Sequence, residues 1–365
     1  MFGSLSAGTS LAEETIDALV RSHSVKYDGA GTMLLVERNG SRKIAVAGLA
    51  DRERGIAMKE SMPFPIGSNT KLFIGVVIFQ LMEEGKLSLE TKVASLYPPT
   101  TKLRRLANYR GKNYWDRVTV GMLLNHTAGF VDYLNIYGED EKAIARYAAE
   151  GDGYDFDKLI ELVLNFGDAR FPPGKRYEYC NTGHLILGDI IGRLTGRDWR
   201  DAVKKRILEP LGMSHTYFGT RLPKAVAQRM PRGYYQGRPV SMPMSLANSA
   251  GEIVSTLSDL ARFIRGWGRG ELYKKPETLR IQREKGFQLR SPDPAYRDFL
   301  YGYGIMKIGP YYGHGGQTFG FQSFVAYDPE SDELIVTEIN DGMGDAMGLF
   351  LQAAIWKVPQ QRGKK

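Results

Sequence analysis

The feature that most constrains the fold is the apolar run Leu72–Met82, in which Gln80 is the one polar residue. Pro65 and Gly67 precede this run, and Glu83-Glu84-Gly85 follows it. A helix that is apolar on every face requires a protein interior around it. The run is also too short, and too closely flanked by charges, for a membrane span. The sequence therefore predicts a buried central helix that stops near the glycine, inside a sizeable protein.

Two residues with catalytic potential stand at the start of this helix. Ser68 and Lys71 are three positions apart, so they share a helix face and the lysine nitrogen can reach the serine hydroxyl. Burial favours a neutral amine, and the N–H groups of a helix N-terminus stabilise a developing oxyanion. These are the requirements of an activated serine nucleophile, and no other serine in the chain has a lysine three residues later. The alternative is a helix-capping serine beside an ordinary surface lysine.

Composition and charge exclude several classes of function. The chain has 365 residues, of which 42% are hydrophobic and 25% charged, as in one large globular domain or two lobes. Its net charge of +8 is spread without a basic stripe, so no nucleic-acid partner is expected. The five histidines lack metal-ligand spacing, and we expect neither a metal nor another cofactor.

The number of cysteines and the composition of the first ten residues are informative about the cellular compartment of the protein. Cys180 is the single cysteine and excludes an intramolecular disulfide, which suits the cytosol or a periplasmic fold. Residues 1–10 are small and polar, and no membrane span is expected. We therefore expect a periplasmic or secreted protein if a signal peptide has been removed, and a cytoplasmic one otherwise. The oligomeric state stays open.

Strand patterns lie at both ends of the chain, and helical patterns lie between them. Asn39-Gly40 separates the apolar runs 29–36 and 43–49, which is a strong hairpin signal. Further strands are expected at 301–308, 320–327 and 334–339. Helices are expected at 118–129, 155–166, 183–194, 199–208, 258–267 and 344–357.

This order predicts an α+β fold. An antiparallel sheet is completed by both ends of the chain, and a helical lobe is inserted between them. One catalytic domain is expected over 10–358, with the sheet lobe from 10–67 and 235–358, the helical lobe from 72–234, and a polar tail at 359–365.

A turn-rich loop, Phe171–Gly183, carries a second set of candidates. Tyr179 can act as acid or base if a neighbouring cation lowers its pKa, and the amide of Asn181 can hold a substrate carbonyl. Tyr133 and Asn135 have the same spacing. Tyr179 is preferred because a Pro-Gly turn precedes it and an apolar helix follows. The alternative is an aromatic residue packed in the core.

The third motif is the glycine-rich segment between the strands expected at 301–308 and 320–327. It contains His314, Gly315, Gly316 and Gln317, and its glycines allow the backbone to approach a ligand closely. Its N–H groups are candidates for an oxyanion hole, and His314 is a candidate substrate contact. The alternative is a tight hairpin with a surface histidine. The segment is neither a dinucleotide fingerprint nor a phosphate-binding loop.

His126 stands in Asn125-His126-Thr127-Ala128-Gly129 and invites a Ser-His-Asp interpretation. We interpret it instead as a structural histidine that bonds the backbone of its own loop. No Gly-x-Ser-x-Gly sequence surrounds Ser68, which argues against an α/β-hydrolase.

The order of the motifs resembles that of the class C β-lactamase-like serine hydrolase family. In chain order, the motifs are Ser68-x-x-Lys71, Leu123–Gly129, Pro173-Gly174 with Tyr179-Cys180-Asn181, and His314-Gly315-Gly316. The family includes penicillin-binding proteins, D-Ala-D-Ala carboxypeptidases, D-aminopeptidases, D-amino-acid amidases and esterases. The resemblance runs from about residue 10 to about residue 357. It implies an α+β fold of the α/β sandwich kind, in which an antiparallel sheet flanked by helices carries an all-helical lobe, in agreement with the order of elements.

The resemblance also implies a role for each matched residue. Ser68 would be the nucleophile that forms an acyl-enzyme. Lys71 and Tyr179 would move its proton, and which of the two is the base stays open. Asn181 would hold the substrate amide. The backbone N–H groups of Ser68 and Gln317 would form the oxyanion hole.

These roles describe a metal-independent serine hydrolase that acts on amide or ester bonds of a small-molecule or peptide substrate. D-Ala-D-Ala carboxypeptidase or D-aminopeptidase-like activity is expected first, with a carboxylesterase for small acyl esters as the alternative. His314 stands where β-lactamases carry Lys-Thr-Gly, as in peptidase and amidase members, which counts against efficient β-lactam hydrolysis. A β-lactamase and a non-catalytic penicillin-binding sensor therefore rank lower.

Overall fold

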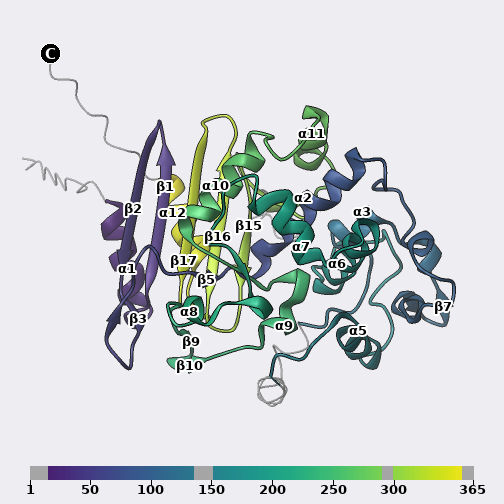
Figure 1. The fold of residues 1–365 in the computed structure, drawn as a ribbon, viewed down its shortest axis with the longest axis horizontal. Coiled ribbons are helices and arrows are strands. Elements are labelled where there is room, and N and C mark those ends of the chain that lie inside the picture. The colour runs from purple at the N-terminus through teal and green to yellow at the C-terminus, as the bar shows by residue number, and fades with distance from the viewer. Residues whose placement is uncertain (1–14, 135–150, 290–298, 356–365) are drawn as a thin grey trace, which may run out of the picture.

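A computed structural model describes residues 15–134, 151–289 and 299–355, and Figure 1 shows its arrangement. Its main sheet has eight strands in the order β12-β13-β14-β15-β16-β17-β1-β2, and every neighbouring pair is antiparallel. The strands are β1 Thr32–Arg38, β2 Ser41–Ala47, β12 Gln288–Leu289, β13 Phe299–Tyr301, β14 Met306–Ile308, β15 Tyr311–Gln317, β16 Gln322–Asp328 and β17 Glu333–Ile339. The predicted antiparallel sheet in an α+β fold is confirmed.

Strands from the first and the last described ranges meet in the middle of this sheet. β1 pairs with β17, with Thr32 opposite Ile339, so the first and last long strands lie side by side (Figure 1). The predicted hairpin between β1 and β2 is confirmed. Asn39 and Gly40 take φ values of 52° and 72° at its turn, a conformation that asparagine and glycine adopt most easily.

Helices cover both faces of the sheet. Leu334 and Val336 of β17 face one core, and Ile335 and Ile339 face the other, as expected from the alternation of side chains along a strand. Helices α1 (Ile16–Lys26) and α12 (Ala346–Ile355) pack on the second face, and α10 (Leu257–Gly268) packs on the first.

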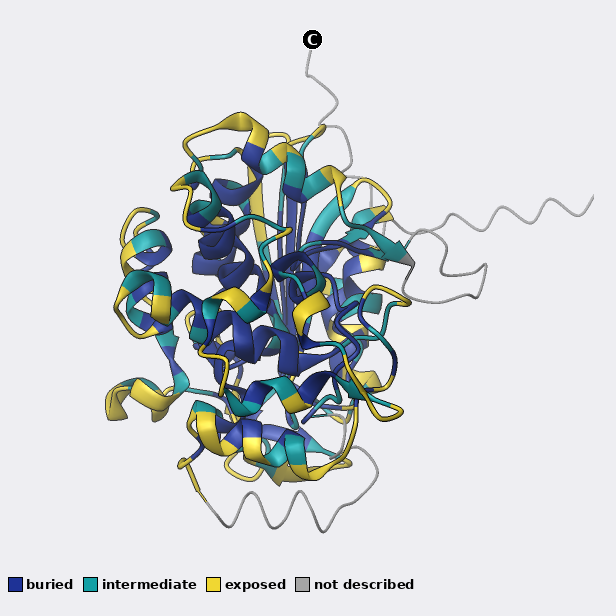
Figure 2. Cartoon of the chain, turned by 90° about the vertical axis from the view of Figure 1, so that its right-hand side faces the viewer, coloured by how far each residue is buried: buried dark blue, intermediate teal, exposed yellow. Residues whose placement is uncertain are grey.

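Helix α2 (Thr70–Glu83) is the buried helix predicted from the apolar run. Its residues from Thr70 to Phe79 are all buried, and it contacts α6 and α7 as well as the sheet side of the molecule. The interior between sheet and helices is correspondingly dark blue in Figure 2. The other helices are α3 Val120–Leu124, α5 Phe156–Asn165, α6 Asn181–Thr195, α7 Trp199–Val203, α8 Lys224–Ala227, α9 Met244–Ala247 and α11 Pro276–Glu284.

The remaining strands are short and lie outside the main sheet. They are β3 Leu49–Asp51, β4 Ile56–Ala57, β5 Phe64–Pro65, β6 Asn108–Tyr109, β7 Lys112–Asn113, β8 Tyr217–Phe218, β9 Gly233–Tyr235, β10 Arg238–Val240 and β11 Ile253–Ser255. β11 pairs with both β5 and β8, and this small sheet supports the segment that enters α2.

The segment expected as a glycine-rich loop is in fact strand β15. A Cβ atom on Gly313 would lie 1.8 Å from the Val325 oxygen, and one on Gly316 would lie 1.9 Å from the Ile66 oxygen. The glycines therefore let β15 approach two backbone segments closely. Glycine is rare in strands, which is why the local sequence does not indicate one.

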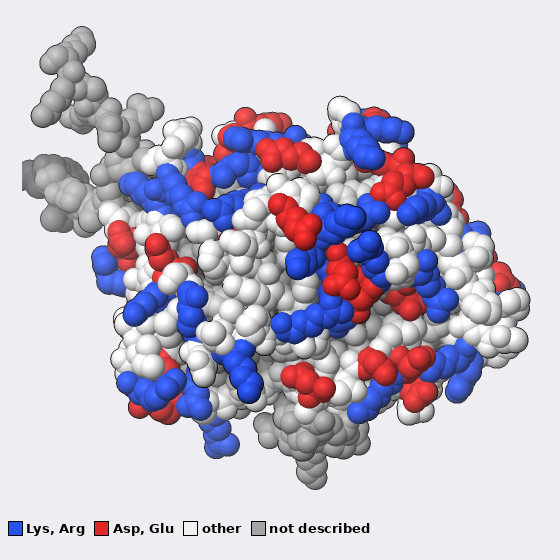
Figure 3. All heavy atoms as spheres, viewed as in Figure 1, with Lys and Arg blue, Asp and Glu red and all other residues white. Residues whose placement is uncertain are grey.

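The surface of the described residues is mixed in charge. Figure 3 shows Lys and Arg beside Asp and Glu over much of the viewed face, and exposed ion pairs such as Arg221–Asp201 (2.6 Å) occur. Among the helices described, none combines the length and hydropathy that a membrane crossing would need. Within the same residues, no group of three or more His, Cys, Asp or Glu could hold a metal ion.

Candidate active site

Ser68 lies in the 3-10 turn Gly67–Asn69, between β5 and α2. The Ile66 N–H donates to the Ile253 oxygen at 2.9 Å, which fixes the entry to this turn. Gly67 has φ 52°, and a Cβ atom on it would lie 2.7 Å from the Gln317 nitrogen. Glycine at position 67 therefore lets the serine turn lie against the end of β15. The backbone N–H groups of Ser68 and Gln317, which are the two predicted oxyanion donors, belong to these two segments.

The Lys71 nitrogen is held by three oxygen atoms. Lys71 is fully buried, and its Nζ lies 2.9 Å from Ser68 Oγ, 2.7 Å from Asn181 Oδ1 and 2.8 Å from the Ala250 oxygen. Burial lowers the pKa of Lys71 to about 7, against the opposing influence of the Asp132 carboxylate. The neutral amine is therefore accessible at neutral pH.

The chemistry of these three oxygens orients the neutral amine. The oxygens of Asn181 and Ala250 only accept hydrogen bonds, so they take the two hydrogens of a neutral amine. Its lone pair then faces the Ser68 hydroxyl, which is the remaining neighbour. In this arrangement Lys71 can accept the serine proton.

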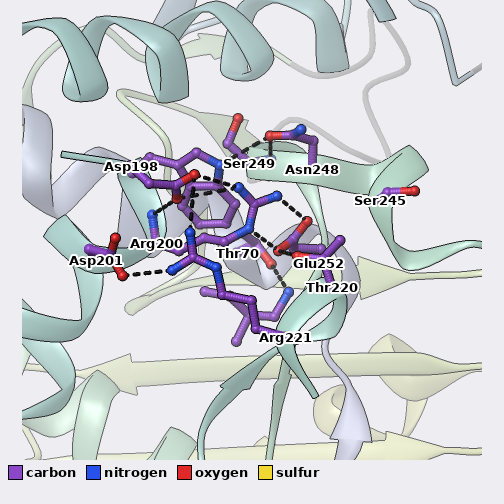
Figure 4. A network of polar contacts seen from close by, with 12 residues as sticks. Thr70, Asp198, Arg200, Asp201, Thr220, Arg221, Ser245, Asn248, Ser249 and Glu252 are labelled. Carbon is purple, nitrogen blue, oxygen red and sulfur yellow. Dashed lines mark hydrogen bonds and ion pairs between the residues drawn. The ribbon is translucent and has the colours of Figure 1, made fainter. Parts of the chain in front are cut away.

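A buried polar network lies beside the segment that carries Ala250. Ala250 lies between Asn248 and Glu252 in the sequence. The Glu252 carboxylate accepts a hydrogen bond from Arg200 Nη2 at 2.7 Å. Figure 4 shows Arg200 between Asp198 and Glu252. This network lies behind the acceptor of Lys71 rather than in the cavity.

Tyr179 is half-buried and lies beside Lys71. The Lys71 nitrogen is 5.1 Å from the centre of the Tyr179 ring, and the ring packs against His126 with centroids 4.3 Å apart. Tyr133, which has the same sequence spacing, is fully buried, and its hydroxyl donates to the Ala247 oxygen at 3.1 Å. Tyr179 lines the cavity in front of Ser68, and Tyr133 does not.

Asn181 begins α6, and both ends of its amide are engaged by protein groups. Its Oδ1 accepts from Lys71, and its Nδ2 donates to both carboxylate oxygens of Asp132, at 2.9 and 3.1 Å. Asp132 was missed in the sequence. The available signal was a lone carboxylate in the otherwise apolar stretch 130–134, directly after the segment containing His126.

His126 accepts hydrogen bonds from the loop that carries Tyr179. The Cys180 N–H donates to His126 Nδ1 at 3.2 Å, and the Glu178 N–H donates to the His126 oxygen at 3.1 Å. His126 therefore fastens the loop that carries Tyr179. Burial raises the pKa of the neighbouring Cys180 thiol to about 12, so the thiol stays protonated.

His314 is fully buried on β15, behind the cavity wall rather than on it. Its Nδ1 lies 2.5 Å from the Gly315 oxygen, which can only accept, so Nδ1 carries the hydrogen. The other nitrogen, Nε2, then accepts from the Tyr301 hydroxyl at 2.9 Å. The alternative of a surface histidine is therefore wrong, because His314 is buried and hydrogen-bonded to Tyr301.

A cavity of about 500 Å³ opens in front of Ser68. Gly315 and Gly316 contribute backbone to its wall, and polar side chains come from Ser68, Tyr179, Asn181, Gln317, Thr318, Gln322 and Ser323. Its apolar wall is formed by Leu134, Met242, Met306, Phe319, Phe324 and Met347. Among the described residues that line it, none is Asp, Glu, Lys, Arg or His.

Comparisons with known proteins agree with this fold. Penicillin-binding protein 4 of Amycolatopsis lactamdurans is 29% identical over 263 residues, which cover 69% of this chain and 62% of that protein. The chain thus spans less than two thirds of the length of the curated relatives that it matches first.

Solved structures with the same fold include two amide hydrolases. A D-stereospecific amidohydrolase from Streptomyces sp. has a TM-score of 0.79 and 23% identity, covering 95% of this chain and 100% of that one. The D-amino acid amidase of Ochrobactrum anthropi SV3 has a TM-score of 0.76 and 24% identity, covering 93% and 100%. At this identity, the likeness concerns the fold alone.

The beta-lactamase family model matches residues 16–351, nearly the whole chain. The protein therefore belongs to the beta-lactamase family, the class C β-lactamase-like serine hydrolases that its motifs resemble.

Proposed function

We propose that this protein is a serine hydrolase that cleaves amide or ester bonds through an acyl-enzyme on Ser68. The observation that carries the proposal is the environment of Lys71. Two obligate acceptors hold its nitrogen, and the Ser68 hydroxyl is the third neighbour, at 2.9 Å. A buried amine with a pKa of about 7 is well matched to accept a proton as a general base at neutral pH.

The proposed reaction assigns one task to each group. Ser68 Oγ attacks the substrate carbonyl carbon while its proton passes to Lys71. The N–H groups of Ser68 and Gln317 bind the resulting oxyanion, and Tyr179 relays a proton to the leaving nitrogen or oxygen. Water then attacks the acyl-enzyme, releasing the acid and restoring the serine hydroxyl.

We place substrates that are neutral near the scissile bond first, namely amides or peptides with a D-residue. The two amide hydrolases with the same fold support this class by their names. A D-Ala-D-Ala carboxypeptidase would need to bind a free carboxylate, and no cation lines the cavity among the described residues. The apolar wall of the cavity also supports the second candidate, a carboxylesterase for small acyl esters. β-Lactam hydrolysis ranks lower.

Intact-mass measurement tests the nucleophile. Wild-type protein would be incubated with benzylpenicillin and with a nitrophenyl ester of a D-amino acid, beside Ser68→Ala and the surface control Ser61→Ala. We expect an acyl adduct, mapped to Ser68, in wild type and Ser61→Ala, and none in Ser68→Ala. Hydrolysis by Ser68→Ala at the wild-type rate would contradict the proposal. Panels of D-amides, L-amides and acyl esters would then rank the substrates.

A further inference from the structure

A carboxylate lies directly behind the amide of Asn181. Both oxygens of Asp132 accept hydrogen bonds from Asn181 Nδ2, and Asp132 Oδ1 also accepts from the Leu134 N–H at 2.9 Å. The contacts form a continuous chain from Asp132 through Asn181 and Lys71 to Ser68. Asp132 does not line the cavity, so it reaches the substrate only through the other three residues.

We propose that Asp132 is a positioning residue that locks the Asn181 amide in the orientation that keeps the Lys71 lone pair on Ser68. The inference rests on the proposed function, because it concerns how the same site holds its base. It assigns Asp132 a role in the reaction without contact with the reacting atoms.

The orientation follows from donors and acceptors. A carboxylate only accepts, so Asp132 selects the NH₂ end of Asn181 and leaves the oxygen for Lys71. A flipped amide would turn its oxygen toward the carboxylate and its NH₂ toward the lysine nitrogen. The Lys71 lone pair would then be drawn toward Asn181 instead of Ser68, and the serine would lose its proton acceptor.

The charge of Asp132 acts on Lys71 in addition to this geometry. The other titratable groups that face Lys71 are Tyr179 and Cys180, from the loop before α6, and His184, on α6. Burial raises the pKa of Cys180 and lowers that of His184, so both are neutral at pH 7. Asp132 is the acidic group among them. Burial raises the pKa of Asp132, while hydrogen bonds from Leu134 and Asn181 and the charge of Lys71 oppose that rise, and the ionised carboxylate favours the protonated lysine.

Replacing Asp132 by asparagine removes both the hold on the Asn181 amide and the negative charge near Lys71, with little change in side-chain volume. Because an asparagine can present either end to Asn181, the lock is lost, and we expect the plateau of kcat/KM to fall by up to about a hundredfold. Because a negative charge near Lys71 is gone, the pKa of Lys71 falls. The acid limb of the kcat/KM profile, where the lysine loses its proton, then moves to lower pH.

The experiment is a pH profile of kcat/KM with an activated ester for wild type, Asp132→Asn, Asp132→Glu and a control, Asp116→Asn. Asp116 carries the same charge but is exposed and paired with Arg104, so its loss should leave the profile unchanged. We expect a lower plateau with a shifted limb in Asp132→Asn, and partial recovery in Asp132→Glu. ¹⁵N NMR titration of the Lys71 amine gives its pKa independently of turnover and should show the same shift.

A uniform loss of rate with an unmoved limb and an unmoved lysine pKa would overturn the inference, because a purely structural role predicts that result. Wild-type kinetics in Asp132→Asn would overturn it too. These outcomes differ from a failure of the proposed function, which would appear as hydrolysis that persists in Ser68→Ala. If Asp132→Asn unfolds, Asp132→Glu decides the question. It keeps the charge but alters the contact with the Asn181 amide, so the plateau of kcat/KM should fall while the lysine pKa stays near the wild-type value, and a wild-type plateau would overturn the inference.

Discussion

Replacing Gly67 by alanine tests whether the close approach of the serine turn to β15 builds the oxyanion hole. Gly67 has φ 52°, and the new Cβ atom would lie 2.7 Å from the nitrogen and 2.8 Å from the oxygen of Gln317. A left-handed conformation costs an alanine about 1–2 kcal/mol. The contact itself cannot be relieved by a rotamer change, because the neighbouring atoms are backbone, so the end of β15 must move away.

The expected effect on catalysis is much larger than the effect on stability. Moving the Gln317 N–H removes one oxyanion donor, which costs roughly a hundred- to a thousandfold in kcat in comparable sites. The free energy of unfolding should fall by about 1–2 kcal/mol from the backbone conformation, with some addition from the displaced strand. Steady-state kinetics with an activated ester and urea unfolding would measure the two effects separately.

Gly85→Ala is the matched control. Gly85 also has a left-handed φ, 71°, but a Cβ atom there would meet nothing within 4 Å. We expect Gly85→Ala to lower the free energy of unfolding by a similar amount, because of the same left-handed conformation, and to keep the wild-type kcat/KM. The reasoning is refuted if Gly67→Ala retains full activity, or if both variants lose activity equally.

Three further predictions concern the base, the tyrosines and the buried ion pair. In wild type, kcat/KM should rise with pH through an apparent pKa near 7, because Lys71 must be neutral to accept a proton; a flat profile from pH 5 to 9 would exclude it as the base. Tyr179→Phe should lower kcat about a hundredfold or more, whereas Tyr133→Phe should cost about 1 kcal/mol of stability and leave kcat intact. Arg200→Met should destabilise the fold by about 3–5 kcal/mol, since it leaves Glu252 buried without its partner; thermal and urea unfolding within error of wild type would contradict this.

Local sequence patterns were sufficient for the central helix and the first hairpin. The run from Leu72 is apolar on every face, and Asn39-Gly40 specifies a tight turn, so neighbouring residues alone determine both elements. The Ser68–Lys71 contact was predictable for the same reason, because helical spacing places the two side chains together. Their roles in catalysis remain proposals.

Features that depend on distant residues could not be read from the sequence. In strand β15, Gly313 and Gly316 lie against backbone from β16 and from the serine turn, and the three glycines of this strand disfavour strand formation when its own sequence is considered alone. The place of Asp132 depends on the fold bringing it next to Asn181, 49 positions later. The burial of His314 likewise depends on its hydrogen bond with Tyr301.

The pairing of β1 with β17 has a consequence for how the protein is made. Strand β1 is synthesised long before its partner β17, which is complete only at Ile339, so the middle of the sheet cannot close until the chain has left the ribosome as far as β17. The turn at Ser68 likewise waits for Ile253 and Gln317. Pairing between residues so far apart in the sequence is slow. Ser68 therefore becomes reactive only after the segments around it have folded. A nascent chain that is stalled before β17 should carry the serine and the lysine but remain unreactive toward acylating agents.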